Sequence, residues 1–124
     1  MHILFLMSAF KVGGQEIVTN TLASHFIKQG HKVIIATLNK PAEEMELRVD
    51  ARIPLIQVGS YQVCKKTIVP LTNLIRNFNA DIVINQWGLP YIPAKILYQI
   101  KKHNPDLNFK TISVYHNRRS KVKL

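Results

Sequence analysis

The fold is decided by residues 3–38, which read ILFLMSAFKVGGQEIVTNTLASHFIKQGHKVIIATL. Residues 3–7 form a continuous apolar run, as expected of a parallel strand that is covered on both faces of a sheet. Residues 33–38 form a second apolar run, which is rich in β-branched side chains and is therefore also typical of a strand. A helical pattern over about residues 15–29 separates the two runs. The segment therefore predicts a β-α-β unit.

The expected helix carries apolar residues at helical spacing. Val18, Leu22 and Phe26 recur every four residues, so they are expected to form its apolar stripe, which Ile17, Thr21 and Ala23 are expected to widen. Gly30 is expected to end the helix, because glycine adopts the left-handed backbone conformation without a Cβ penalty.

The remaining sequence repeats this alternation of strand and helix. Strands are expected at residues 53–58, 82–86 and 109–115, and helices at about residues 66–79 and 91–102. Pro54 favours the edge of the sheet for its strand. Pro70 favours a later start for its helix, because proline fits only a helix's first turn. Residues 39–52 hold four of the seven acidic residues and are expected to form a loop or short helix.

The order of these elements, β-α-β-β-α-β-α-β, predicts an α/β fold with a Rossmann-like, doubly wound parallel sheet of about five strands. Right-handed crossovers favour the strand order 3-2-1-4-5. The order reverses between strands 1 and 4, and ligands of such sheets bind beyond the carboxyl ends of the strands at this switch point. Three segments, residues 8–14, 85–88 and 116–117, are therefore expected to meet there.

The composition limits the classes to which the chain can belong. Its 124 residues suit one domain of ordinary size, and its 47% hydrophobic content excludes a disordered or collagen-like chain. Cys64 is the single cysteine, so an intrachain disulfide and a thiolate metal cluster are both excluded. The five histidines share no ligand spacing, and we predict no metal site. Since no apolar run approaches the ~18 residues of a membrane span, we expect a cytoplasmic protein.

The chain is strongly basic. Its formal net charge is +10, and seven of its 17 lysines and arginines lie in residues 101–124, together with one of its seven acidic residues. Such an excess favours an anionic partner, and nucleic acid, a membrane surface and a phosphorylated substrate all qualify. A chain end that is merely solvated is the other interpretation of the same residues.

Two glycines lie at the expected site. Gly13 and Gly14 stand between the first strand and the first helix, where close backbone approach and free helix N–H groups suit a phosphate. They match neither G-x-G-x-x-G nor a Walker A loop, which disfavours a dinucleotide cofactor. The geometry of a tight turn would also explain them.

Polar and aromatic residues end two other strands. Asn85 and Trp87 lie at the end of the fourth strand, and amides beside an aromatic ring are typical of sugar or base recognition, although Trp87 would equally cap the core. His116 ends the fifth strand, next to Asn117. Its imidazole is suited to bonding a sugar hydroxyl or transferring a proton, and a structural histidine is the alternative.

Six motifs occur in order along nearly the whole chain. They are Ile3-Leu4-Phe5-Leu6, Gly13-Gly14-Gln15-Glu16, Leu22-Ala23, Gly30-His31-Lys32-Val33, Asn79-Ala80-Asp81-Ile82-Val83 and Ser113-Val114-Tyr115-His116-Asn117. In this order they resemble the N-terminal part of a family 4 glycosyltransferase of the GT-B fold. Ala80 stands where that family commonly has proline.

The resemblance implies a function and roles for the candidate residues. Gly13 and Gly14 would lie near the donor diphosphate and the acceptor, His116 would contact the transferred sugar, and the reaction would need no metal or cofactor. The parent enzyme would be a retaining glycosyltransferase that moves a hexose-type sugar from a nucleotide-sugar to a glycan or lipid-linked acceptor, in polysaccharide or glycolipid synthesis. A second domain with an E-x7-E pair would bind the nucleotide. Residues 1–124 would then be a truncated acceptor-side domain, inactive alone, with peripheral contact to the inner face of an anionic membrane.

The sequence leaves two other functions as alternatives. One is a non-catalytic basic α/β module that binds nucleic acid or an anionic membrane, although no aromatic-studded basic strand suggests an RNA-binding sheet. The other is a different GT-B enzyme, such as a nucleotide-sugar epimerase. A response regulator is disfavoured, because residues 8–11 after the first strand are Ser, Ala, Phe and Lys, where such a domain gathers acids.

Overall fold

The computed structural model describes residues 1–7, 14–38, 50–59, 62–86 and 91–113. Within these ranges the elements are β1 (His2–Met7), α1 (Gly14–Lys28), β2 (Lys32–Thr37), β3 (Leu55–Gln57), α3 (Lys65–Phe78), β4 (Ile82–Asn85), α4 (Tyr91–His103) and β5 (Lys110–Ser113). The strands and helices expected in these ranges are all present, in the predicted order. The expectations for residues 39–49 and 114–115 fall outside the described residues.

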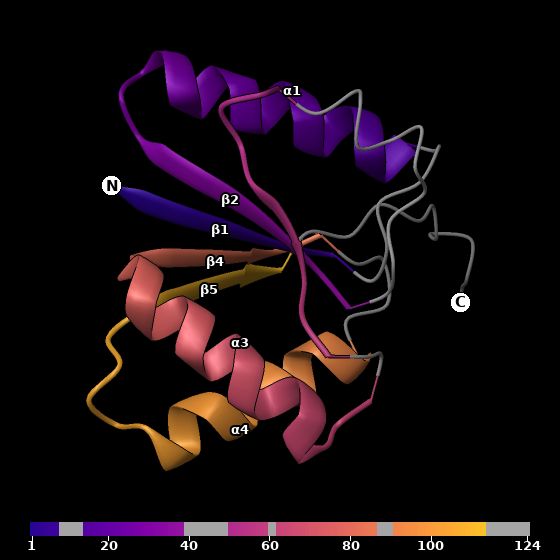
Figure 1. Cartoon of the computed structure of the whole chain (residues 1–124), viewed down its shortest axis with the longest axis vertical. Helices are drawn as coiled ribbons and strands as arrows, with labels where there is room; N and C mark the ends of the chain where they lie inside the picture. Colours follow the sequence, from indigo (N-terminus) through magenta and orange to yellow (C-terminus); the bar gives the residue numbers. More distant parts are fainter. Residues whose placement is uncertain (8–13, 39–49, 60–61, 87–90, 114–124) are drawn as a thin grey trace, which may run out of the picture.

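The strands of the described residues form one sheet in the order β3-β2-β1-β4-β5, with all neighbours parallel. The predicted α/β fold and strand order are therefore confirmed. The register pairs Leu6 of β1 with Ala36 of β2 and with Asn85 of β4, so these three strands end side by side. Helix α1 covers one face of the sheet, and α3 and α4 cover the other (Figure 1).

Strand β1 lies at the centre of the sheet and is buried from Ile3 to Met7. Ile3, Phe5 and Met7 pack into the core on the α1 side, whereas Leu4 and Leu6 pack into the core beneath α3 and α4. A strand in this position contacts a helical layer on each face, so apolar side chains are favoured at every position. This is the physical reason why a continuous apolar run predicted the fold.

The buried side of α1 differs from the predicted stripe. Thr19 and Ala23 are fully buried, and Leu22 and Phe26 pack against the same core. These four residues follow the i, i+3, i+4, i+7 spacing of one helix face. Val18 falls outside that face and is 37% exposed, and Ile17 and Thr21 are exposed as well, so their predicted places in the stripe are wrong. The predicted place of Ala23 is confirmed.

Gly30 ends α1 as predicted, with a φ of +93°. Its N–H donates to the carbonyl of Ile27 (3.0 Å), and the N–H of His31 donates to the carbonyl of Phe26 (3.0 Å). Helix α3 ends in the same way at Asn79, whose φ is +56°. Each turn satisfies carbonyls at the helix end and directs the chain into the next strand.

Helix α3 begins at Lys65, so the prediction of a later start is wrong. Pro70 lies inside the helix, and because it has no N–H it leaves the carbonyl of Lys66 without its i+4 donor. Tertiary packing holds this first turn instead: Thr67 is fully buried, and a Cβ added to Gly59 would lie 2.5 Å from the Cα of Thr67. The backbone that follows β3 therefore lies directly against the turn that Pro70 was expected to prevent.

Strand β3 is shorter than predicted, since only Leu55–Gln57 of residues 53–58 pair with β2. Pro54 precedes the paired residues, and its carbonyl accepts a hydrogen bond from the N–H of Ile35 (3.0 Å). Proline has no N–H to donate, which suits a strand at the edge of a sheet. The predicted edge position of this strand is confirmed.

Candidate functional site

The strand ends at the switch point lie side by side and form what we call the carboxyl edge. Asn85 pairs with Leu6 of β1 and with Ser113 of β5. The N–H of Gln86 donates to the carbonyl of Leu6 (2.9 Å), so the chain still runs along β1 after β4 ends. Gly14 opens α1 at the same edge (Figure 1). The structure thus brings the ends of three strands and the start of one helix to the place that the topology predicted.

Asn85 combines burial with unused hydrogen-bonding capacity. Its side chain is fully buried, and neither its amide nitrogen nor its amide oxygen has a hydrogen-bond partner in the described structure. Side chains alternate along a strand, so Asn85 shares the face of Val83, which packs beneath α3 and α4. A buried polar atom without a partner costs about 1–3 kcal/mol. A ligand at the switch point would supply the missing partner.

Two threonines add further unpaired groups, which the sequence reasoning missed. Thr37 is the last residue of β2 and Thr19 lies in α1; both are fully buried, and neither hydroxyl has a partner in the described structure. Thr37 pairs with Met7 and shares its face, on the α1 side of the sheet. The available signal was a polar residue that closes an apolar strand, and Asn85 closes β4 in the same way.

The other predicted site residues, Gly13, Trp87, His116 and Asn117, lie outside the described residues. Gly14 and Asn85 are therefore the two candidates whose backbone the structure places, and both lie at the carboxyl edge. The roles assigned to all six residues stay predictions.

A comparison with protein families places the chain in one of them. The family model named Glycosyltransferase Family 4 matches residues 12–122, a span that contains every described element from α1 to β5. The chain belongs to glycosyltransferase family 4. No curated protein matches the sequence significantly.

Membership of glycosyltransferase family 4 confirms the resemblance carried by the motifs, and the structure shows what one of them does. The carboxylate of Asp81 accepts a hydrogen bond from the N–H of His2 (2.7 Å), and the N–H of Asp81 donates to the carbonyl of His2 (2.8 Å). The carbonyl of Asp81 accepts from the N–H of Lys110 (3.0 Å). In this family 4 domain, Asp81 therefore ties together the starts of β1, β4 and β5. Because the sheet is all parallel, every strand begins on this side of it, and we call that side the amino edge.

The described part of this family 4 domain holds no group of three or more His, Cys, Asp or Glu side chains that could bind a metal ion. Cys64 is partly exposed at the N-cap of α3, and its side chain makes no capping hydrogen bond. Within the described ranges, no helix has both the length and the apolar character that crossing a bilayer requires.

The carboxylates with shifted pKa values lie on segments that lead into a strand, away from the carboxyl edge. Arg52 donates to the carboxylate of Asp50 from Nε (3.0 Å) and Nη2 (2.7 Å), and this pairing lowers the pKa of Asp50 to about 2. Arg76 binds the carboxylate of Asp106 and lowers its pKa in the same way. We therefore interpret both ion pairs as contacts that stabilise the fold.

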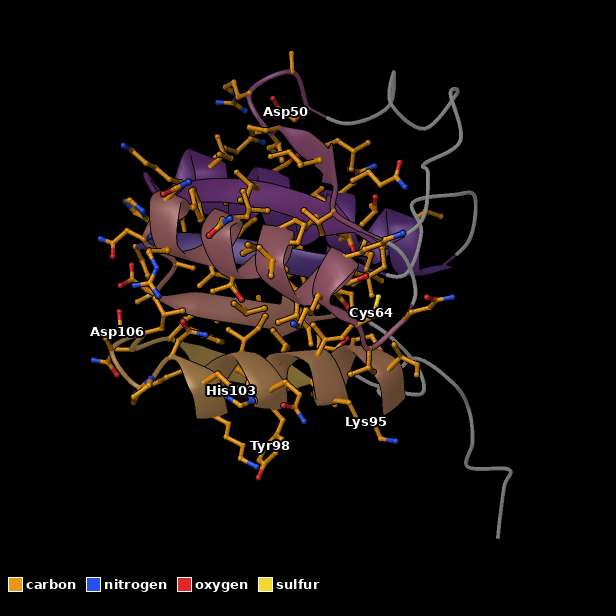
Figure 2. All side chains as sticks on the ribbon, turned by 60° about the horizontal axis from the view of Figure 1, so that its bottom comes forward. Asp50, Cys64, Lys95, Tyr98, His103 and Asp106 are labelled. Carbon is orange, nitrogen blue, oxygen red and sulfur yellow. The ribbon has the colours of Figure 1, made fainter. Side chains whose placement is uncertain are left out.

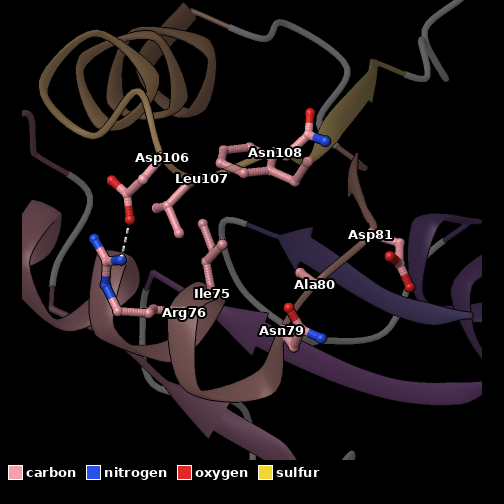
Figure 3. Close-up of a pocket in the computed structure, with 9 residues that line it drawn as sticks. Ile75, Arg76, Asn79, Ala80, Asp81, Asp106, Leu107 and Asn108 are labelled. Atoms are coloured by element: carbon pink, nitrogen blue, oxygen red, sulfur yellow. Dashed lines mark hydrogen bonds and ion pairs between the residues drawn. The ribbon is translucent and has the colours of Figure 1, made fainter.

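A hollow of about 380 Å³ lies at the amino edge, between the end of α3 and the segment that leads into β5 (Figure 3). Its polar lining comes from Arg76, Asn79, Asp81, Asp106 and Asn108. Arg76 binds Asp106 and also donates from Nη2 to the side-chain oxygen of Asn104 (3.1 Å), while Asp81 binds the backbone of His2. Because these charged groups already hold the elements together, we place the candidate site of this family 4 domain at the carboxyl edge and not in this hollow.

Proposed function

We propose that the chain is the acceptor-side domain of a retaining, nucleotide-sugar-dependent glycosyltransferase that transfers a hexose-type sugar in polysaccharide or glycolipid synthesis. Membership of glycosyltransferase family 4 supports the reaction class. The nucleotide-binding domain of the enzyme lies outside residues 1–124, and these residues alone transfer no sugar. The enzyme works in the cytoplasm and, for a lipid-linked acceptor, at the inner face of the membrane.

The observation that carries the proposal is the unpaired, fully buried amide of Asn85 at the switch point. A primary amide offers two donors and one acceptor, and a sugar hydroxyl both donates and accepts, so the two groups are complementary. A hydrogen bond made in such a buried setting is electrostatically stronger than one made in water. We therefore assign Asn85 to a hydroxyl of the sugar substrate, which it holds in position.

The other candidates complete the proposed site. Gly13 and Gly14 leave room for the donor diphosphate at the start of α1, where free N–H groups favour negative charge. His116 contacts the transferred sugar, and Trp87 and Asn117 contact the substrates. Catalysis is electrostatic, because groups fixed around the departing diphosphate stabilise the charge that develops on it, and neither a metal nor a cofactor takes part.

A transfer assay with labelled nucleotide-sugars and a metal chelator tests the proposal. It compares residues 1–124 with the product of the uninterrupted reading frame that includes Leu124. We expect transfer only from a longer product that carries the E-x7-E pair, and no effect of the chelator. In that product His116→Ala should lower transfer about 100-fold, while Lys28→Gln on the exposed side of α1 leaves it unchanged. Transfer by residues 1–124 alone, or transfer abolished by the chelator, would contradict the proposal.

A further inference from the structure

The hydroxyls of Thr19 and Thr37 belong to the same layer of the structure, between α1 and the sheet. Thr19 lies nine residues before Lys28, the last residue of α1, and is therefore roughly 14 Å from the amino edge along the helix. Thr37 lies five residues after Lys32, the first residue of β2, and is roughly 17 Å from that edge along the strand. Because α1 packs on β2 and both threonines are buried on this face, they lie at nearly the same level of the sheet.

The hydroxyl of Thr19 is not used by its own helix. A threonine in a helix can donate its hydroxyl to the carbonyl four residues earlier. Thr21 donates in this way to Ile17 (2.9 Å), and Thr72 of α3 donates to Ile68 (2.6 Å). The hydroxyl of Thr19 has no partner in the described structure. Helix formation therefore does not explain why a polar residue occupies this buried position.

The layer around the two hydroxyls is apolar. Met7, Ala23 and Ile35 belong to the core on the α1 side of the sheet. Among the described residues, no Lys, Arg, Asp or Glu side chain is buried. Figure 2 shows Asp50 and Lys95 at the outside of the molecule, and Lys95 belongs to α4, which lies across the sheet from α1 (Figure 1). An anionic group would lose its hydration in this layer without meeting a counter-charge, so the layer favours a neutral partner.

The two hydroxyls are separate from the amide of Asn85. Thr37 ends β2 and Asn85 ends β4, and β1 lies between these two strands. Thr37 shares the α1 face of the sheet, whereas Asn85 shares the face beneath α3 and α4. The carboxyl edge therefore offers buried, unpaired polar atoms on each face of the sheet, on either side of β1. Transfer of a sugar brings together a donor and an acceptor, and this arrangement offers hydrogen bonds to each of them.

We propose that Thr19 and Thr37 form a subsite for the hydroxymethyl group on the terminal sugar of the acceptor. A hydroxyl both donates and accepts, so one incoming hydroxyl can pair with both threonines. Because both threonines are fully buried, the group that reaches them must extend into the layer, and the hydroxymethyl group projects furthest from a hexose ring. The inference rests on the proposed function, which assigns the acceptor to this domain. It makes that function more specific, because the acceptor then ends in a neutral hexose and not in a lipid phosphate.

Nuclear magnetic resonance with isotope-labelled threonine methyl groups tests the subsite. The methyl glycosides of glucose, galactose, mannose and N-acetylglucosamine are added to residues 1–124 without a nucleotide-sugar, so the result is independent of transfer. We expect at least one glycoside to shift the signals of Thr19 and Thr37 along a single binding curve, and to leave that of the exposed Thr21 in place. Inorganic phosphate should shift none of the three. The corresponding deoxy sugar, which has a methyl group in place of the hydroxymethyl group, should bind about fivefold more weakly.

Variants of single threonines show which hydroxyls bind the sugar. Thr19→Val and Thr37→Val each remove one hydroxyl with little change of shape, and each should weaken binding of the glycoside about fivefold. The matched control is Thr21→Val, which removes a hydroxyl from the exposed side of α1 and should leave binding unchanged. Thr37→Ser keeps the hydroxyl and should retain most of the binding. Circular dichroism checks that each variant is folded.

Thermal unfolding distinguishes a sugar subsite from a site for a permanent structural water. Without added sugar, both valine variants should raise the midpoint of unfolding, because each removes an unpaired buried hydroxyl. A structural water that bonded both hydroxyls would be lost in these variants, and the midpoint would then fall.

Four results would overturn the subsite. They are no shift of the two signals by any of the glycosides, an equal loss of binding in Thr21→Val, binding of phosphate at the two threonines, and a lower unfolding midpoint in both valine variants. In the proposed longer enzyme, Thr37→Val should raise the KM for the acceptor about fivefold and leave the KM for the nucleotide-sugar unchanged. Binding of a glycoside at Thr19 and Thr37, combined with no transfer by the longer enzyme, would instead contradict the proposed function alone.

Discussion

The polar residues at the two ends of strand β4 differ in whether they have hydrogen-bond partners. Asp81, which immediately precedes the strand, has its carboxylate, N–H and carbonyl all engaged with the starts of β1 and β5. Asn85, the last residue of the strand, is more deeply buried and has no partner for its amide in the described structure. Thr37 at the end of β2 is also buried, and its hydroxyl likewise has no hydrogen-bond partner in the described structure.

This difference indicates that the amino edge and the carboxyl edge have different roles in the protein. At the amino edge, hydrogen bonds and ion pairs satisfy the polar groups and so stabilise the fold. At the carboxyl edge, buried amide and hydroxyl groups lower stability unless something else binds them. When such groups lie at a switch point, a bound ligand that pairs with them stabilises the folded state. This is the property expected of a substrate-binding edge.

The largest effect is expected at Asn85. In the longer enzyme proposed above, Asn85→Leu should lower kcat/KM for transfer about 100-fold, because the proposed hydrogen bond to the sugar hydroxyl is lost. The same change should raise the midpoint of thermal unfolding, because it removes two unsatisfied buried atoms. Steady-state kinetics and calorimetry measure the two effects.

Two further variants serve as controls for this prediction. Thr37→Val removes another unpaired buried hydroxyl with little change of shape, and should raise the unfolding midpoint as well. Asn85→Ala avoids the larger volume of leucine. Full activity of Asn85→Ala would show that the amide does not hold the substrate.

The next effect compares a glycine from each edge. Gly59 follows β3 with a φ of +62°, and an added Cβ would lie 2.5 Å from the Cα of Thr67. Gly30 precedes β2 with a φ of +93°, and its Cβ would meet nothing within 4 Å. Gly59→Ala should lower the free energy of unfolding by about 2–3 kcal/mol, from backbone strain and overpacking together, and Gly30→Ala by about 1 kcal/mol, from backbone strain alone. Urea denaturation checks both values, and equal losses would mean that the chain after β3 is not packed on α3.

The architecture could be predicted from the sequence because few residue patterns are compatible with its buried parallel strands. A parallel strand between two helical layers needs apolar side chains on both faces, and β1 meets this condition at every position from Ile3 to Met7. The wrong expectations for the helices concern the apolar stripe of α1 and the effect of Pro70 on α3, where neighbouring segments decide the outcome. The orientation of α1 leaves Val18 outside the buried face. The packing of Gly59 on α3 compensates for the hydrogen bond that Pro70 cannot donate.

The candidate site could be located from the sequence but its chemistry could be read only in part. Strand order placed Asn85 at the switch point, since the position of the site depends on topology alone. That its amide has no partner depends on every neighbouring donor and acceptor, and no local pattern reports those. The unpaired hydroxyls of Thr19 and Thr37 were missed for the same reason.

A smaller effect is expected from the paired amino edge. Asp81→Ala removes the acceptor for the N–H of His2 and should lower the free energy of unfolding by about 1 kcal/mol, with no change in transfer by the proposed longer enzyme. Asp81→Asn keeps a side-chain oxygen in place and should restore most of the loss. A drop in transfer that exceeds the drop in stability would assign the amino edge a part in catalysis and break the comparison between the two edges.

The smallest effect is expected from the exposed pair of Asp50 and Arg52. The pair lowers the pKa of Asp50 from 3.8 to about 2 in the folded protein, so the unfolded chain binds a proton at higher pH than the folded one. The stabilisation is therefore complete above about pH 4 and is lost as the pH falls toward 2. In a nuclear magnetic resonance titration of the carboxyl group, the Arg52→Gln variant should return the midpoint of Asp50 to near 3.8 and remove this part of the pH dependence of unfolding. An unchanged midpoint in the variant would show that Arg52 does not cause the lowered pKa of Asp50. The ion pairs of the amino edge would then stabilise the fold less than the comparison with the carboxyl edge implies.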